Sequence, residues 1–388
     1  MDATMTAMTS SLGSRSLGGV AQADLSKMLP PQCYTQGEWF ERELQAIHFP
    51  AWHFVCLSSS IPDTGSFVTR RFLERSVIVV RSEDGTIRAF LNSCRHRAAP
   101  LTTQKCGKNT QFKCPFHEWT YDTSGNLISA PGLGGCVTRS DLPGLKLNLV
   151  SVQCEVTAGL VFINLNAENE VPLDAYLGNY IDKVALPHQI QRMHCVQEKA
   201  YTLTTNWKLY IEVDMETLHT NFIHSRSIGS QPVRPIEHDR NWFGVYHKNS
   251  LSPALFPEKR NLAFSPPRDI IGEAAEGTHF CVILPGFFIV TAPEVMWWIQ
   301  KTPISATRTS VNVGYAFHEE TLARSDFNDI APLYFERLDQ VILEDDQICE
   351  YQLEGLSNQV QGHYTPVEPI AAYFSALVGS RLREAGYE

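Results

Sequence analysis

The chain has 388 residues, of which 43% are hydrophobic and 19% are charged, a composition typical of a globular protein with a substantial core. Its formal net charge is -10 and it contains no block of basic residues, which argues against a nucleic-acid partner because phosphate backbones are bound by clustered Lys and Arg. No apolar run reaches membrane length, since the longest candidate, Phe280 to Ile299, is interrupted by prolines and Glu294.

The ten cysteines are irregularly spaced, which is not the pattern of a disulfide framework. Several lie in apolar runs, such as Cys56, Cys154 and Cys281, and are most simply buried thiols. We therefore predict a reducing, cytoplasmic location. Residues 1–28 are rich in Ser, Thr, Gly and Met without the apolar core of a signal peptide, and we expect them to form a disordered tail.

The rest of the chain divides by pattern into three segments, and together they predict an α+β fold. Residues 29–50 carry apolar residues near helical spacing and indicate a lead-in helix that packs on the larger domain. Residues 51–166 contain short β-branched and aromatic runs separated by turns, which indicates a small all-β domain. Residues 167–388 indicate a larger domain with an antiparallel sheet over 279–292, 296–304 and 307–320, flanked by helices over 206–219 and 328–356.

Two short loops in the all-β segment each carry one cysteine and one histidine. The first loop holds Cys94 and His96, and the second holds Cys114 and His117. Two thiolates and two imidazoles could bind one zinc ion or one Rieske [2Fe-2S] cluster. Zinc fingers usually group Cys with Cys and His with His, so the alternating arrangement favours the cluster. A structural zinc site remains the alternative.

A second group of candidate ligands follows Asn206. Glu216 and His219 are three residues apart, which on a helix places them on one face. His219 and His224 are five residues apart, and on a straight helix they would point in different directions. If both bind one metal, the helix must end or bulge between them.

The segment from Leu338 to Leu356 offers a carboxylate for the same site. Its apolar residues form a helical stripe on which Asp345 falls, whereas Asp346 points about 100° away. Because a carboxylate on a buried stripe needs a partner, we assign Asp345 as the third ligand and expect Glu344 and Asp346 to be solvated.

These motifs resemble those of the Rieske non-haem iron oxygenases, specifically the α subunit of the ring-hydroxylating type. The resemblance covers nearly the whole chain and rests on four segments, 29–55, 90–100, 114–127 and 206–224. It implies a [2Fe-2S] cluster held by Cys94, His96, Cys114 and His117. It also implies mononuclear Fe(II) held by a facial triad, which here would be His219, His224 and Asp345.

The same resemblance implies the activity and the partners. A reductase or ferredoxin would supply electrons from NADH or NADPH, and O2 would be used to hydroxylate or oxidatively demethylate a small organic substrate. The family forms head-to-tail homotrimers, in which Glu216 would connect His219 to His117 of the partner subunit and so act in catalysis. No membrane and no nucleic acid are implied. An electron carrier with a non-catalytic second domain is the alternative function, and a zinc-stapled structural protein is a third.

Three residues depart from the family pattern. Glu118 replaces the glycine that usually follows the second histidine of the cluster, and Val213 replaces an asparagine. Glu216 stands where aspartate is common, as in the branch that acts on quaternary ammonium compounds.

Bulky residues indicate where a substrate pocket would lie. We expect walls from His279 to Trp298 and from Trp242 to Tyr246, which follow the proposed iron helix. For Trp297 and Trp298 themselves, a place in the core is the default interpretation.

Overall fold

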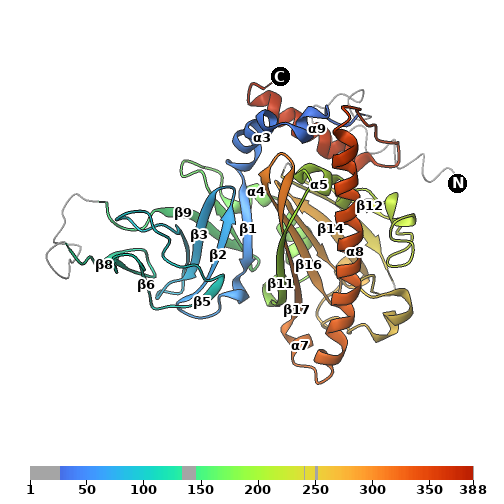
Figure 1. Cartoon of the computed structure of the whole chain (residues 1–388). Coiled ribbons are helices and arrows are strands. Elements are labelled where there is room, and N and C mark those ends of the chain that lie inside the picture. Colours follow the sequence, from blue (N-terminus) through green and yellow to red (C-terminus); the bar gives the residue numbers. More distant parts are fainter. Residues whose placement is uncertain (1–26, 133–145, 240, 250–251, 388) are drawn as a thin grey trace. The chain divides into compact units, whose positions relative to one another are not determined.

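The computed structural model describes residues 27–132, 146–239, 241–249 and 252–387, so nearly all of the predicted N-terminal tail lies outside the described residues. The chain divides into two compact units (Figure 1). The β unit spans Pro50–Leu173, and the mixed unit combines the segment that ends at Phe49 with Asp174–Glu388. Within the described ranges, no helix has both the length and the apolar character that crossing a membrane requires.

The β unit is built on an antiparallel seven-stranded sheet in the order β1-β10-β9-β4-β3-β2-β5. The predicted β-branched runs form four of these strands. A three-stranded sheet, β6-β7-β8, carries the second cysteine–histidine loop between its first two strands. The strands are β1 (Trp52–Leu57), β2 (Ser66–Phe72), β3 (Arg75–Arg81), β4 (Ile87–Leu91), β5 (Cys106–Lys108), β6 (Gln111–Lys113), β7 (Thr120–Asp122), β8 (Leu127–Ser129), β9 (Ser151–Thr157) and β10 (Leu160–Asn164), with a 3-10 turn η3 at Ser58–Ser60.

The mixed unit contains the predicted antiparallel sheet, in the order β11-β17-β16-β15-β14-β13-β12. The sequence patterns did not predict its edge strand β11 or strand β13. The strands are β11 (Met193–Leu203), β12 (Arg234–Pro235), β13 (Trp242–Lys248), β14 (Gly277–Ile283), β15 (Phe287–Thr291), β16 (Met296–Ser305) and β17 (Arg308–His318).

Three helices of the mixed unit position its candidate site and core. They are α5 (Trp207–Met215), the 30-residue α8 (Phe327–Leu356) and α9 (Pro369–Glu384), which the sequence patterns missed. Helix α5 begins where the Asn206 side chain accepts a hydrogen bond from the Lys208 amide at 3.0 Å, as an N-cap residue does. The shorter elements are α4 (Leu173–Leu177), η4 (Ile181–Ala185), η5 (Ile190–Arg192), η6 (His219–Asn221), η7 (Pro257–Leu262), α6 (Glu273–Glu276) and α7 (Glu319–Leu322).

The lead-in segment is helical as predicted, but it is interrupted. It comprises α2 (Gln32–Thr35), α3 (Gly37–Glu43) and a π-helical turn, η2 (Leu44–His48). Gln36 has extended backbone angles and separates the first two helices. The segment packs on α8 and α9 within the mixed unit.

A buried ion pair joins this segment to α5. The Lys208 ammonium lies 2.6 Å from Glu43, and both side chains are fully buried. Lys208 also donates to the Cys33 carbonyl at 2.8 Å, and Trp207 donates to Glu43 at 2.8 Å. Because burial raises the pKa of Glu43, its ionised form depends on these donors.

Replacing Lys208 by Met is expected to lower the free energy of unfolding by about 3–5 kcal/mol, because the Glu43 carboxylate remains buried without its cation. Chemical denaturation of the variant measures this loss. The double variant Lys208→Met/Glu43→Leu is expected to recover most of the stability, and Lys248→Met, which breaks an exposed pair with Glu276, should change little. A single variant as stable as the wild type would contradict the assignment.

Candidate metal centres

The two cysteine–histidine loops of the β unit share one backbone geometry. In the first loop, the Ala98 amide donates to the Cys94 carbonyl and the Cys94 amide donates to Ala99, both at 2.9 Å. In the second loop, the Glu118 amide donates to Cys114 at 3.0 Å and the Cys114 amide donates to Trp119 at 2.8 Å. Each loop therefore closes a tight turn directly after its cysteine, and the histidine lies within that turn.

The four predicted cluster ligands suit a Rieske centre. Cys94 and Cys114 are buried thiols, and the rings of His96 and His117 lie 4.6 Å apart between centroids. His96 stacks on Trp119 at 5.0 Å. The Nδ1 atom of His117 is buried without a hydrogen-bond partner among the described residues, which leaves it free for a metal.

The shared geometry explains why Glu118 is an unusual residue at its position. Both Ala98 and Glu118, the fourth residue after each cysteine, have φ of 60°. Glycine adopts this left-handed region without steric cost, whereas an L-residue there costs about 1–2 kcal/mol. The Glu118 side chain is exposed and pairs with Lys113 at 3.0 Å, so it adds a surface charge beside the second loop and offsets little of that cost.

In the mixed unit, helix α5 ends before the candidate iron ligands. Glu216 is the C-terminal cap of α5 and has extended backbone angles, so the prediction that it shares a helical face with His219 was wrong. The two side chains nevertheless meet, because the Glu216 carboxylate accepts the backbone amides of Leu218 and His219 at 2.5 and 3.1 Å. These hydrogen bonds from Leu218 and His219 fix the backbone between the end of α5 and the 3-10 turn η6.

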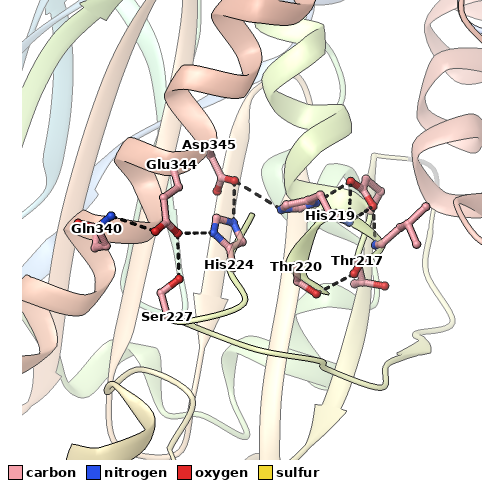
Figure 2. A network of polar contacts seen from close by, with 10 residues as sticks. Thr217, His219, Thr220, His224, Ser227, Gln340, Glu344 and Asp345 are labelled. Atoms are coloured by element: carbon pink, nitrogen blue, oxygen red, sulfur yellow. Dashed lines mark hydrogen bonds and ion pairs between the residues drawn. The ribbon is translucent and has the colours of Figure 1, made fainter. Parts of the chain in front are cut away.

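The turn brings both histidines to the same carboxylate (Figure 2). His224 Nε2 lies 2.8 Å from Asp345 Oδ1, and His219 Nε2 lies 3.5 Å from the same atom. One ligand atom from each of the three residues lies within 4.8 Å of the other two. Helix α5 ends at Met215, before both histidines, so helical spacing does not keep them apart, and this geometry suits a facial triad.

The Nδ1 atom of each imidazole is hydrogen-bonded to a carboxylate. His219 Nδ1 lies 2.6 Å from Glu216, and His224 Nδ1 lies 2.6 Å from Glu344. Metal-binding histidines usually donate their second ring nitrogen to such a partner, which fixes the ring and its tautomer. Both Nε2 atoms are therefore aimed at the position that a metal would occupy.

The prediction that Glu344 and Asp346 are solvated was wrong. Glu344 is held by His224, by Ser227 at 2.9 Å and by Gln340 (Figure 2). Asp346 is 7% exposed, and burial raises its pKa. Helix α8 is covered on more than one side, so its buried surface is wider than a single stripe.

The site is electrostatically suited to a cation. Burial lowers the pKa of His219, but the Asp345 and Glu216 carboxylates outweigh this effect and raise it to about 10. Burial raises the pKa of Asp345, but hydrogen bonds from His219 and His224 outweigh burial and hold it below its usual value. Positive charge is therefore favoured between these groups, whether it is carried by protons or by a metal.

Replacing Glu344 by Gln is expected to weaken binding of the mononuclear iron about 10- to 100-fold, because His224 loses the carboxylate that orients it. Metal titration of the apo protein measures the affinity, and the visible spectrum of the cluster should be unchanged. Glu350→Gln, an exposed residue of the same helix, is the matched control. Equal iron affinity in the two variants would show that Glu344 is not a positioning residue.

A pocket opens beside the three ligands, and part of its wall comes from the predicted segments. Those segments contribute Val245, Phe280, Phe288, Val290 and Trp297. Trp297 belongs to the core, as the default interpretation held, and it also lines the pocket. Trp298 is absent from the lining and packs over Gly314, as core.

The departure from the family pattern at Val213 also lies at this pocket. Val213 is one of the lining residues, beside Glu216 and His219. An apolar side chain there extends the apolar wall close to the proposed iron position. The remaining polar contributions to the lining include Asp214, which is paired with the buried Lys301.

Comparisons with known proteins define first the class and then the family. The model of the Rieske [2Fe-2S] domain matches residues 51–144, which contain both cysteine–histidine loops. The model of the ring-hydroxylating alpha subunit catalytic domain matches residues 190–384, half of the chain. The chain therefore belongs to the ring-hydroxylating oxygenase α-subunit family, whose members bind a Rieske cluster and mononuclear iron.

Similar curated proteins act on more than one kind of substrate. The oxygenase subunit of glycine betaine monooxygenase from Pseudomonas aeruginosa is 31% identical over 201 residues, which is 52% of this chain and 46% of that protein. Biphenyl 2,3-dioxygenase subunit alpha from Rhodococcus jostii is 32% identical over 207 residues, which is 50% of this chain and 43% of that protein. The matched region thus spans less than half the length of each relative.

Solved structures agree with the fold over most of the chain. A quaternary ammonium Rieske monooxygenase gives a TM-score of 0.78 at 23% identity and covers 93% of this chain and 96% of its own. Naphthalene 1,2-dioxygenase from Rhodococcus sp. gives 0.74 at 18% identity and covers 98% of this chain and 97% of its own. At these identities the likeness establishes the fold.

Proposed function

We propose that the chain is the terminal oxygenase component of a Rieske non-haem iron system. It would use O2 and electrons from a reductase or ferredoxin to hydroxylate or oxidatively demethylate a small organic substrate, either aromatic or quaternary ammonium. The observation that carries this proposal is the paired arrangement of His219 and His224, each held at Nδ1 by a carboxylate and aimed at Asp345, beside an apolar pocket.

The candidate ligands would form two separate metal centres. Cys94, His96, Cys114 and His117 would hold the cluster, and His219, His224 and Asp345 would hold the iron. When bound, the cluster supplies single electrons and the iron supplies open coordination positions for oxygen. Glu216 and Glu344 fix the imidazole orientation, and the apolar walls exclude water from the reacting end of the pocket.

Glu216 also supports a proposal about assembly. It keeps 15% of its side-chain surface exposed while holding His219, so the carboxylate is still reachable from outside the subunit. A head-to-tail homotrimer would let it meet His117 of the partner subunit and connect the two centres. A heterologous interface of this kind closes into a ring when the rotation permits.

A cytoplasmic location suits the free cysteines of the described residues.

Metal analysis of the purified protein tests the oxygenase against its alternatives. The proposal predicts about three irons per chain, two in the cluster and one at the triad. Zinc alone would indicate a structural protein, and cluster iron alone after anaerobic iron reconstitution would favour an electron carrier. Oxygen uptake with a generic reductase, measured over a panel of aromatic acids and quaternary amines, then identifies the substrate class.

A further inference from the structure

The candidate pocket is lined by a buried arginine whose Nε has no hydrogen-bond partner among the described residues. Arg337 lies on α8, lines the pocket and is 2% exposed. Its Nε is buried without a hydrogen-bond partner among the described residues. Burial lowers the pKa of Arg337 to about 9, although the Glu344 and Asp345 carboxylates partly oppose this effect. The sequence patterns did not single out this residue.

Nearby carboxylates are already engaged. Glu344 is bound to His224 and Ser227, and Asp345 lies between the two histidines. Asp214, the other acid of the pocket wall besides Glu216, is paired with Lys301. Arg337 therefore faces a cavity whose own acids are committed elsewhere.

A second arginine strengthens the local positive charge. Arg260 lies close enough that its guanidinium also lowers the pKa of Arg337. It donates to the carbonyl of Ile228, a lining residue, at 3.3 Å, while its Nε is buried without a partner among the described residues. Arg260 is not among the lining residues, so Arg337 would make the contact in the pocket and Arg260 would add positive charge behind it. A guanidinium recognises a carboxylate through paired hydrogen bonds.

Helix α8 sets the distance between this position and the iron ligands. The lining residues Arg337, Leu338, Val341, Ile342 and Asp345 follow the spacing of one helical face. Arg337 and Asp345 are eight residues apart, which corresponds to about 12 Å along the helix axis. A ligand anchored at Arg337 would thus extend along α8 toward the iron position.

We propose that the substrate carries a carboxylate that Arg337, assisted by Arg260, binds at the end of the pocket away from the iron ligands. The proposal rests on the proposed function and narrows its substrate class to carboxylic acids. Phe280, Phe288 and Trp297 would contact the remainder of the molecule, which is either an aromatic ring or an ammonium group.

Isothermal titration calorimetry of the anaerobic holoprotein, without reductase, tests this inference. The probes are glycine betaine, γ-butyrobetaine, anthranilate and cinnamate, each compared with its primary amide, which keeps the shape and removes the charge. At least one acid is expected to bind at least tenfold more tightly than its amide. In Arg337→Gln this ratio should fall to about one, whereas Arg337→Lys should retain part of it because the charge remains.

Two controls separate binding from folding. Arg324→Gln removes an exposed arginine paired with Asp326 and should leave the acid-to-amide ratio unchanged. Thermal unfolding of ligand-free Arg337→Gln, and of Arg337→Met as a second variant, should occur at or above the wild-type temperature, because an unpaired buried charge has been removed. A large decrease in both variants would assign Arg337 to structure and overturn the inference.

The binding result is independent of turnover. No acid preference in the wild type, or a preference that persists in Arg337→Gln, overturns the carboxylate position even if oxygen uptake is observed with a neutral substrate. An acid preference that depends on Arg337 supports the position even if metal analysis rejects the oxygenase.

Discussion

Replacing Asp345 by Ala is expected to remove about one iron per chain and leave the two cluster irons in place. Asp345 is the only carboxylate that both imidazoles approach through Nε2 among the described residues, so its loss leaves two neutral ligands for the metal. Oxygen uptake should fall by more than the 10- to 100-fold typical of changes in outer partners. Iron analysis together with the visible spectrum of the cluster measures both effects.

Asp346→Asn is the matched control for this change. Asp346 is the next residue on α8 and is equally buried, but it has no contact with the two histidines. It should retain the full iron content, although its burial allows a change in stability. If Asp345→Ala keeps three irons while Asp346→Asn loses one, the metal site involves the face of α8 that carries Asp346.

Replacing Glu216 by Gln is expected to leave the cluster spectrum intact and, after loading with excess iron, most of the iron in place, while blocking electron transfer between the centres. The Glu216 carboxylate holds His219 Nδ1 and keeps part of its surface exposed. The amide keeps the size of the side chain but removes the negative charge that would hold both imidazoles. After the cluster has been reduced, addition of oxygen and substrate should reoxidise it at least about 100-fold more slowly than in the wild type.

Single-turnover stopped-flow at the cluster absorbance measures this rate. Glu216 also caps the backbone after α5, so the variant must first be shown to bind iron normally. Thr217→Val, which changes a neighbouring pocket residue whose carbonyl accepts from Thr220, is the control and should reoxidise at the wild-type rate. Wild-type reoxidation in Glu216→Gln with normal metal content would remove the bridging role.

The fold was predictable where a strand is a short continuous run of apolar residues that is buried on both faces. The runs that became β2, β3, β4 and β10 are rich in β-branched and aromatic residues, and those of β14 to β17 are buried almost throughout. Strand β11 was missed because it is the edge of its sheet and carries polar residues such as Glu198, which is exposed, and Lys199, which is half-buried. Its pairing with β17 over nearly its whole length is a long-range effect that local propensity does not contain.

The sequence singled out the three residues that the structure brings together in the mixed unit and one of their two supporting carboxylates, Glu216, but not the other, Glu344. Spacing singled out Cys94, His96, Cys114 and His117, and helical phase singled out Asp345. The same phase argument assigned Glu344 to solvent, because it assumed that α8 buries one stripe. The buried residues of α8 include Arg337, Asp345 and Asp346, which do not share one narrow stripe. Tertiary packing on several sides of α8 thus determined what the sequence pattern alone could not.

The proposed iron ligands come from distant parts of the sequence, so binding of the metal would be coupled to folding of the mixed unit. His224 and Asp345 are 121 residues apart and join the segment after α5 to the middle of α8. A metal that binds only when these two segments are in contact stabilises the folded state by mass action. Each tenfold excess of free iron over its Kd adds about 1.4 kcal/mol to the free energy of unfolding. The free energy of unfolding of the mixed unit is therefore expected to rise with the concentration of free iron, because the unfolded chain does not hold these ligands together.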